Sequence, residues 1–359
     1  MKRGPTVALA AAAVAAALAA GGARSTSAGG FSIVRLVSDG GVPAASVDRV
    51  LVNGWGLVAG PTGPFWTTNE ASDRSALYTG AGLKQRLTVR VAGGPTGIVY
   101  NPGDGFRVSG GGHSDPARFI YACEDGRIRA WTPTVPAGWS TTAVVAVDAA
   151  GQAAIFRGVA LAAGRLYATD FHNGRVDVFD SRWRRVAMPK GAFSDPAVPA
   201  WYAPDNIEAL DGRLYVTYVY RAPVDGNDAP SGGYVDEFAT DGRLVARVAA
   251  KGALAEPWGL ALAPRSFGRF GGDLLVASFG SGHVDAYRRT AGDWRYDGAL
   301  AGADGRPLVV NGIWGLAFGN GSDAGPRDRL FFMAGPHAWR GASELEVHGL
   351  FGAIAAVSS

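Results

Sequence analysis

Residues 257–262 read Pro-Trp-Gly-Leu-Ala-Leu, and this stretch is one copy of an element that recurs along the chain. The copies are spaced roughly fifty residues apart, a period that is typical of propeller blades. The six copies lie at residues 55–58, 95–99, 157–161, 204–207, 257–262 and 314–318. Glycine recurs in them because the innermost strands of a propeller crowd around its axis, where large side chains do not fit.

Further strand-like segments follow each copy of this element. A second apolar strand comes next, and then a third that alternates apolar and polar residues, most clearly at residues 175–180. A fourth strand is expected in five of the repeats, at residues 87–91, 143–147, 184–188, 243–248 and 294–300. Four strands in each of six repeats predict an all-β fold, a six-bladed β-propeller over residues 30–359.

The last repeat has no fourth strand of its own. An apolar segment at residues 31–37 is left over at the other end of the chain. We expect this segment to become the outer strand of the last blade, because an unclosed ring would expose strand edges. Residues 101–116, 190–204 and 222–233 are the longest stretches without a regular pattern.

Several of these segments resemble an uncharacterised family of exported bacterial propeller proteins. The resemblance rests on Val-Asn-Gly-Trp-Gly-Leu at 52–57, Glu-Pro-Trp-Gly-Leu-Ala at 256–261, and Met-Ala-Gly-Pro at 333–336 followed by His-Gly-Leu-Phe-Gly at 348–352. The architecture is more distantly similar to gluconolactonase-like, streptogramin-lyase-like and NHL-repeat propellers. The resemblance implies a fold but no activity, since fold does not fix function.

The chain departs from the pattern of that family at two places. Asp205 stands where the family pattern implies an aromatic residue, and residues 337–346 form what looks like an enlarged loop. Both departures would alter a ligand site.

The first 29 residues have the features of an export signal. Lys2 and Arg3 precede an apolar, alanine-rich run at residues 7–20, which small residues follow. The run is too short to span a bilayer and is typical of a secretory signal peptide, with a buried or anchoring helix as the alternative. We therefore expect a signal peptide at 1–29 and a secreted, periplasmic or cell-envelope protein.

The charge of the chain bears on its possible partners, and its single cysteine bears on the core. The formal net charge is +3, and Lys2 and Arg3 of the signal account for most of it. There is no basic run, so the sequence favours no nucleic-acid partner, and no later segment is apolar enough to cross a membrane. Cys123, the only cysteine, lies in an apolar run and is expected to be a buried core residue.

Strand direction predicts which side chains share a face. If the first strand of each blade runs away from a face, the second strand returns to it, so first-strand starts and second-strand ends meet there. We call this face the top face. First-strand starts contribute Trp55, Arg157, Asp205, Asn206, Trp258 and Trp314, and second-strand ends contribute Asn69, Glu70, Glu124, Asp125, Asp170, His172 and His337. The predicted ligand-binding residues are Asn69, Asp125, Asp205, Asn206, Trp55, Trp258 and Trp314.

These groups could also support metal or acid–base chemistry. Oxygen ligands suit a divalent metal such as calcium, which makes Glu124, Asp170 and Asn206 candidate metal ligands. His172 is a candidate general acid or base, with Asp170 or Glu124 setting its pKa.

Each of these residues also has a structural interpretation. Residues 124–126 and 172–174 fit hairpin turns. Asn206 fits a role in satisfying backbone groups beside the axis, and the tryptophans fit packing between blades.

The sequence favours a binding module over an enzyme. It contains no Gly-x-Ser-x-Gly elbow, no His-Glu-x-x-His and no phosphate-binding glycine loop. We therefore expect the top face to bind a small molecule, a glycan or a protein. A metal-dependent hydrolase or lyase of lactonase-like type is the alternative.

Overall fold

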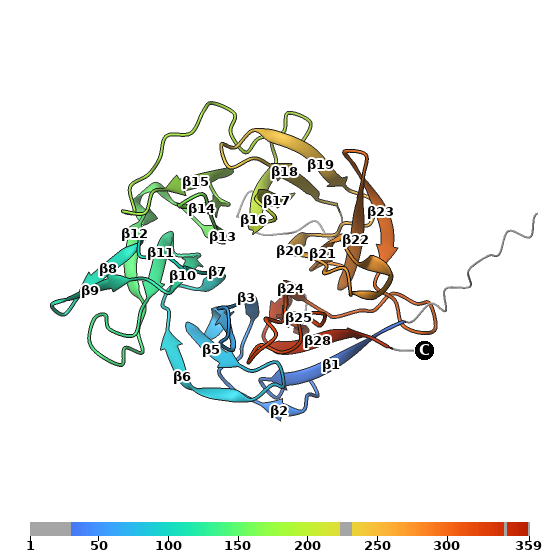
Figure 1. Cartoon of the computed structure of the whole chain (residues 1–359), viewed down its shortest axis with the longest axis horizontal. Coiled ribbons are helices and arrows are strands. Elements are labelled where there is room, and N and C mark those ends of the chain that lie inside the picture. Colours follow the sequence, from blue (N-terminus) through green and yellow to red (C-terminus); the bar gives the residue numbers. More distant parts are fainter. Residues whose placement is uncertain (1–29, 223–231, 341–342, 358–359) are drawn as a thin grey trace, which may run out of the picture.

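Six β-sheets surround a central axis, as Figure 1 shows for the computed structural model of the chain. The structure describes residues 30–222, 232–340 and 343–357. The predicted signal peptide at 1–29 and most of the irregular stretch at 222–233 lie outside the described residues. The prediction of an all-β, six-bladed propeller is confirmed.

The first three blades follow one another along the chain. Blade 1 contains β3 (Gly54–Ala59), β4 (Phe65–Asn69), β5 (Arg74–Tyr78) and β6 (Lys84–Arg90). Blade 2 contains β7 (Pro95–Tyr100), β10 (Phe119–Cys123), β11 (Arg127–Trp131) and β12 (Val144–Asp148). Blade 3 contains β13 (Phe156–Ala162), β14 (Arg165–Asp170) and β15 (Arg175–Phe179).

The remaining blades complete the ring. Blade 4 contains β16 (Tyr202–Leu210), β17 (Arg213–Tyr220), β18 (Tyr234–Phe238) and β19 (Leu244–Ala250). Blade 5 contains β20 (Pro257–Leu262), β21 (Leu274–Ser278), β22 (His283–Thr290) and β23 (Asp293–Ala299). Blade 6 contains β24 (Ile313–Phe318), β25 (Leu330–Ala334), β28 (Leu350–Ala356), β1 (Phe31–Ser38) and β2 (Ser46–Val47).

Short elements decorate the blades. Two hairpins stand outside the sheets: β8 (Arg107–Gly110) with β9 (His113–Pro116), and β26 (His337–Arg340) with β27 (Ser343–Glu346). Three single-turn 3-10 helices occupy Glu70–Ser72, Ala150–Gln152 and Gly268–Phe270. The stretch 101–116 therefore contains a hairpin that its irregular sequence did not predict. No helix among the described residues is long and apolar enough to cross a membrane.

The ring is closed by the strand that the sequence left over. β1 pairs with β28 in antiparallel register from Phe31 opposite Ala356 to Ser38 opposite Leu350. Phe31 is buried, and its ring centroid lies 5.0 Å from that of Phe267 in blade 5. The predicted closure is confirmed.

Blade 3 differs from its prediction. The expected fourth strand at 184–188 is not a strand, and only an isolated bridge joins Arg185 to Phe179. Asp180 holds a tight turn there, since its carboxylate accepts hydrogen bonds from the backbone N–H groups of Arg182 and Arg184. Pro189 follows within a few residues and has no N–H to extend a ladder.

Close contact between the innermost strands explains the repeated glycines. A Cβ added to Gly259 would lie 2.2 Å from the carbonyl oxygen of Trp314, which belongs to the next blade. A Cβ on Gly315 would lie 2.5 Å from the carbonyl oxygen of Trp55. Asn206 takes the place of this glycine in blade 4, and its Nδ2 donates a 2.8 Å hydrogen bond to the Trp258 carbonyl. Each inner strand thus touches the backbone of the next blade.

Candidate functional site

The three tryptophans that begin β3, β20 and β24 meet at the top end of the axis. Ring centroids of Trp55 and Trp314 are 3.8 Å apart and the rings are stacked at 13°. Trp258 presents its ring edge-on, 5.8 Å from Trp55 and 6.0 Å from Trp314. Phe279 completes this tryptophan cluster, in which every residue is buried. The structure thus brings together the predicted aromatic residues of blades 1, 5 and 6.

Arg157 occupies the neighbouring part of the top end. Its guanidinium carbon lies 3.8 Å from the ring centroid of Phe171 and 5.8 Å from that of Trp55. Its Nη1 lies 3.0 Å from Asp205 Oδ1, and its Nε lies 3.6 Å from Glu124 Oε1. The side chain is 8% exposed. Arg157 therefore contacts side chains of four blades, a role that sequence reasoning did not assign to it.

The ion pair with Arg157 explains why residue 205 is an aspartate, where the family pattern implies an aromatic residue. Because Asp205 faces Arg157 from the adjacent blade, a carboxylate here replaces the expected aromatic ring. Burial raises the pKa of Asp205, the Arg157 guanidinium opposes that rise, and the Glu124 carboxylate adds to it. Burial also raises the pKa of Glu70, and repulsion from Glu124 adds to that shift.

Several buried polar atoms at the top end have no hydrogen-bond partner among the described residues. They are Trp55 Nε1, Trp258 Nε1, Trp314 Nε1, Asn69 Nδ2, Asn53 Oδ1, Asp205 Oδ2 and Asn206 Oδ1. Buried polar groups are nearly always paired, and leaving one unpaired costs about 1–3 kcal/mol. These donors and acceptors come from four blades, namely blades 1, 4, 5 and 6.

Other predicted site residues serve the fold. Asp125 forms a two-pronged ion pair with Arg129, with oxygen–nitrogen distances of 2.9 and 2.8 Å. Although burial raises it, the pKa of Asp125 is lowered overall by hydrogen bonds from Arg129 and Arg127. Asp125 therefore acts within its own blade.

Asp170 and His172 belong to the hairpin between β14 and β15. The fully buried Asp170 carboxylate accepts a 2.8 Å hydrogen bond from Asn173 Nδ2 and lies 3.2 Å from Arg175 Nη2. The backbone carbonyl of His172 accepts a hydrogen bond from the Arg221 guanidinium.

Glu124, Asp170 and Asn206 therefore have different partners, which are respectively Arg157, the hairpin and the Trp258 carbonyl. Within the described ranges, no three histidine, cysteine, aspartate or glutamate side chains are placed to hold a metal ion. The metal site stays a prediction that no contact here supports.

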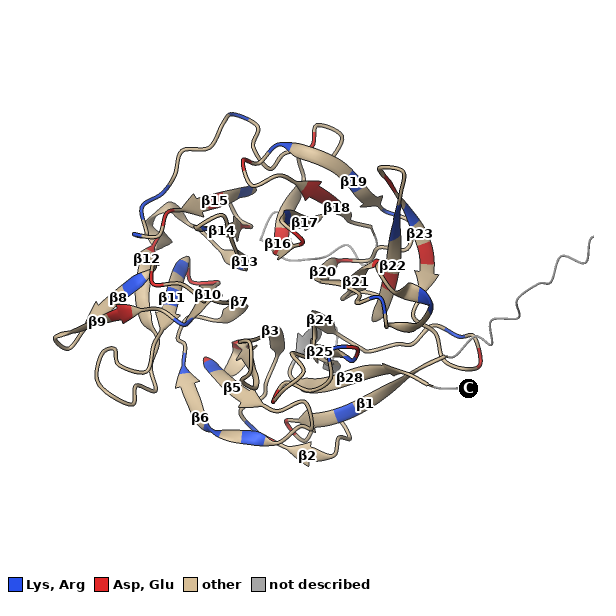
Figure 2. Ribbon diagram, in the orientation of Figure 1, with Lys and Arg blue, Asp and Glu red and all other residues tan. Residues whose placement is uncertain are grey.

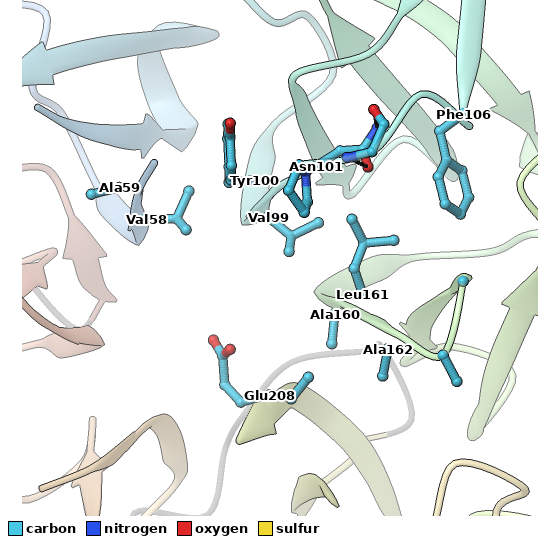
Figure 3. Close-up of a pocket in the computed structure, with 15 residues that line it drawn as sticks. Val58, Ala59, Val99, Tyr100, Asn101, Phe106, Ala160, Leu161, Ala162 and Glu208 are labelled. Atoms are coloured by element: carbon cyan, nitrogen blue, oxygen red, sulfur yellow. Dashed lines mark hydrogen bonds between the residues drawn. The ribbon is translucent and has the colours of Figure 1, made fainter. Parts of the chain in front are cut away.

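An open space lies at the other end of the axis. A cavity of about 570 Å³ is bordered by the ends of β3, β7, β13 and β16, and Figure 3 shows it in close-up. We call it the lower cavity. Its lining includes Val58, Val99, Tyr100, Phe106, Leu161 and Glu208. No sequence motif predicted a role for this face, because the polar motifs lie at the strand ends of the top face.

Glu208 is the one carboxyl group in the described part of the chain that borders the lower cavity. Burial raises its pKa to about 8, and the nearby Asn206 side chain opposes that shift. A void of about 10 Å³, bordered by both Glu208 and Trp258, separates the cavity from the tryptophan cluster. Its volume suits about one water molecule.

A comparison of the repeats would have singled out Glu208. The other blades carry Val58, Val99, Ala160, Ala261 and Ala317 at the equivalent position, two residues after the glycine or Asn206 of the inner strand.

Charges of both signs are interspersed around the described part of the ring, as Figure 2 shows. Cys123 is fully buried in β10, and burial raises the pKa of its thiol to about 12. The interpretation of Cys123 as a core residue is confirmed.

The chain has curated relatives in a giant virus. "Uncharacterized protein L690" of Acanthamoeba polyphaga mimivirus is 32% identical over 294 residues, which cover 79% of this chain and 77% of that protein. "Uncharacterized protein R648" of the same virus is also 32% identical over 294 residues, covering 79% and 72%. No family model matches. These relatives are viral, whereas the motifs implied a bacterial family.

Solved structures share the fold at low sequence identity. A Bacteroides thetaiotaomicron protein of unknown function aligns with a TM-score of 0.54 and 13% identity, covering 90% of this chain and 76% of its own. A streptogramin B lyase aligns with a TM-score of 0.51 and 9% identity, covering 90% and 96%. At these identities the likeness concerns the propeller alone.

Proposed function

Because the chain belongs to the family of the mimivirus proteins L690 and R648, whose names state no activity, we propose its function from its own geometry. It is a binding module that holds a small, neutral, polyhydroxylated ligand, such as a sugar or polyol, at the top end of the propeller axis. The unpaired buried polar atoms around the tryptophan cluster are the observation that carries this proposal.

The unpaired atoms include both hydrogen-bond donors and acceptors, and this combination favours one class of ligand. The three indole N–H groups and Asn69 Nδ2 need acceptors, whereas Asn53 Oδ1, Asp205 Oδ2 and Asn206 Oδ1 need donors. A hydroxyl group both donates and accepts, so a polyol meets both needs at once.

Charge at the top end argues against an ionic ligand. Glu70 and Glu124 would repel an anion, and Arg157 is already paired with Asp205 and Glu124. The same Arg157 guanidinium would repel a cation. A neutral ligand avoids both costs.

The lactonase-like alternative has no comparable support. Its candidate acid–base and metal residues, Asp170 and Glu124, hold a hairpin and an arginine. The streptogramin B lyase shares the propeller at 9% identity, so its named activity does not extend to this chain.

Calorimetry and intrinsic fluorescence with glucose, mannose, maltose and sorbitol test the proposal. Trp258→Phe removes an indole N–H but keeps a ring, and Asn69→Leu removes an amide of similar size. We expect each to weaken binding roughly five- to tenfold, as the loss of one hydrogen bond of about 1 kcal/mol would.

Trp139→Phe is the matched control, because Trp139 is 94% exposed and lies outside the cluster. The proposal fails if none of the four compounds binds the folded protein. It fails equally if Trp139→Phe weakens binding as much as Trp258→Phe does.

Export belongs to this proposal too. Lys2, Arg3 and the apolar run at 7–20 support a cleaved signal peptide and a place outside the cytoplasm. N-terminal sequencing of the accumulated protein in its native cell should find the first residues removed. A mature protein that still carries Lys2 would rule out cleavage.

A further inference from the structure

We propose that the lower cavity binds a small organic cation with an apolar body, an amine or ammonium compound, whose charge pairs with Glu208. This site lies at the opposite end of the axis from the proposed polyol site, and the argument for it is independent of that proposal. It rests on the position of Glu208, the shape of the cavity and the charges that surround it.

Glu208 is an exception among equivalent positions. The corresponding residues of the other five blades are two valines and three alanines. Glu208 is half-buried at the edge of the cavity, and no ion pair with it occurs among the described residues. Burying a carboxylate without an ion pair is unfavourable, and among the described residues only the Asn206 side chain opposes that cost. A bound cation would offset it.

The cavity has the size and walls that such a ligand needs. Its volume of about 570 Å³ falls within the range of small-molecule pockets. In Figure 3 the Glu208 side chain projects from β16 into a space bordered by Val58, Val99 and Ala160. Those walls are apolar and would cover a hydrocarbon body.

Two aromatic residues form part of the wall of the lower cavity. Tyr100 ends β7 of blade 2, and Phe106 lies in the segment between β7 and β8. Ring faces attract ammonium groups, and the attraction strengthens where water is excluded. Carboxylate, aromatic rings and aliphatic walls together favour an amphipathic cation over a neutral or anionic compound.

No other charged group competes for Glu208. Among the residues that the structure describes, Tyr100 is the only other titratable one that lines the cavity. Asn206, two residues earlier on β16, is the one polar group that opposes the effect of burial on the Glu208 pKa. A ligand cation would therefore dominate the electrostatics of this carboxyl group.

Proton release gives the site a distinctive pH dependence. Because burial raises the pKa of Glu208 to about 8, the free protein carries this group protonated at neutral pH. A cation stabilises the ionised form and expels the proton, so affinity should rise with pH. Below about pH 8 the rise should be on the order of tenfold per pH unit.

Calorimetry on the full chain with three matched probes tests the proposal. The probes are phenylbutylamine, phenylbutanol and phenylbutyrate, which share a body and differ in charge. We expect the amine to bind at least tenfold more tightly than the alcohol, and the carboxylate to bind weakest. Titrations in two buffers of different ionisation enthalpy should show close to one proton released per amine bound at neutral pH.

Three variants complete the test. Glu208→Gln should abolish the preference for the amine and the proton release while leaving alcohol binding unchanged. Ala162→Phe should block all three probes by filling the cavity. Asp211→Asn, which removes an exposed carboxylate from the same end of blade 4, should change nothing.

Three results would overturn the proposal. One is that the alcohol binds the unchanged protein as tightly as the amine does. Another is that Glu208→Gln keeps the preference for the amine. The last is that none of the probes binds protein whose circular dichroism shows it to be folded. Binding of sugars at the top end would be unaffected by any of these results.

Discussion

At the scale of single residues, the innermost position of each blade shows how closely the ring is packed. Five blades place glycine there, and a Cβ on any of these glycines would overlap atoms of the next blade. Asn206, the sixth residue, spans the same gap with a hydrogen bond to the Trp258 carbonyl. The inner strands of neighbouring blades are therefore joined in one of two ways, by close backbone contact at glycine or by a hydrogen bond from the Asn206 side chain.

Gly259→Ala should destabilise the protein by about 2–4 kcal/mol, because its Cβ would lie 2.2 Å from the Trp314 carbonyl oxygen. Denaturant unfolding followed by circular dichroism measures the change. Gly63→Ala is the control, since a Cβ there meets nothing within 4 Å. Equal stability of the two variants would contradict this account of the inner ring.

Arg157→Met should destabilise the protein by about 3 kcal/mol at neutral pH, because it leaves the buried Asp205 carboxylate unpaired. The pKa of Asp205 is already raised and would rise further without its partner. A group whose pKa is raised on folding binds its proton more tightly in the folded state. The penalty should therefore shrink as the pH falls through the folded-state pKa.

Urea unfolding at neutral and at mildly acidic pH measures this dependence. The double variant Arg157→Met with Asp205→Asn should recover part of the loss at neutral pH. A deficit that is the same at both values would show that lost packing against Phe171, rather than charge, is what Arg157 contributes.

At the scale of elements, blade 3 shows which strands the sequence pattern predicts and which it does not. Period and apolar alternation predicted the first three strands of every blade, since they reflect local burial. They failed at residues 184–188, where the Asp180 turn and Pro189 prevent a ladder.

The candidate sites also could be predicted only in part from local sequence patterns. The tryptophans could be placed at one end from strand direction alone. The pairing of Arg157 with Asp205 joins residues far apart in sequence, and no local pattern encodes it. Glu208 was visible only by comparing repeats, and its significance needed the cavity, which exists only once four blades meet.

At the scale of the whole molecule, the two ends of the axis differ in kind. The top end carries the tryptophan cluster and Arg157 with its carboxylate partners. The other end is open and mostly apolar. Ligands at the two ends would be separated by the inner ring of glycines, so each could bind without the other.

Deleting residues 31–38 should lower the melting temperature substantially, because β28 would lose its outer partner and blade 5 would lose its contact with Phe31. Differential scanning calorimetry compares the melting temperature of this deletion variant with that of a chain that lacks only residues 1–29. If the two melt at the same temperature, closure by β1 does not contribute to the stability of the ring.

The pairing of β1 with β28 also sets the timing of folding. A ribosome makes β1 before all six inner strands and makes β28 after them. β1 cannot pair with β28 until β28 has been synthesised. One edge of β1 therefore stays unpaired while the blades are being made. Such a long-range contact slows folding and leaves an interval in which neighbouring nascent chains could exchange their first strands.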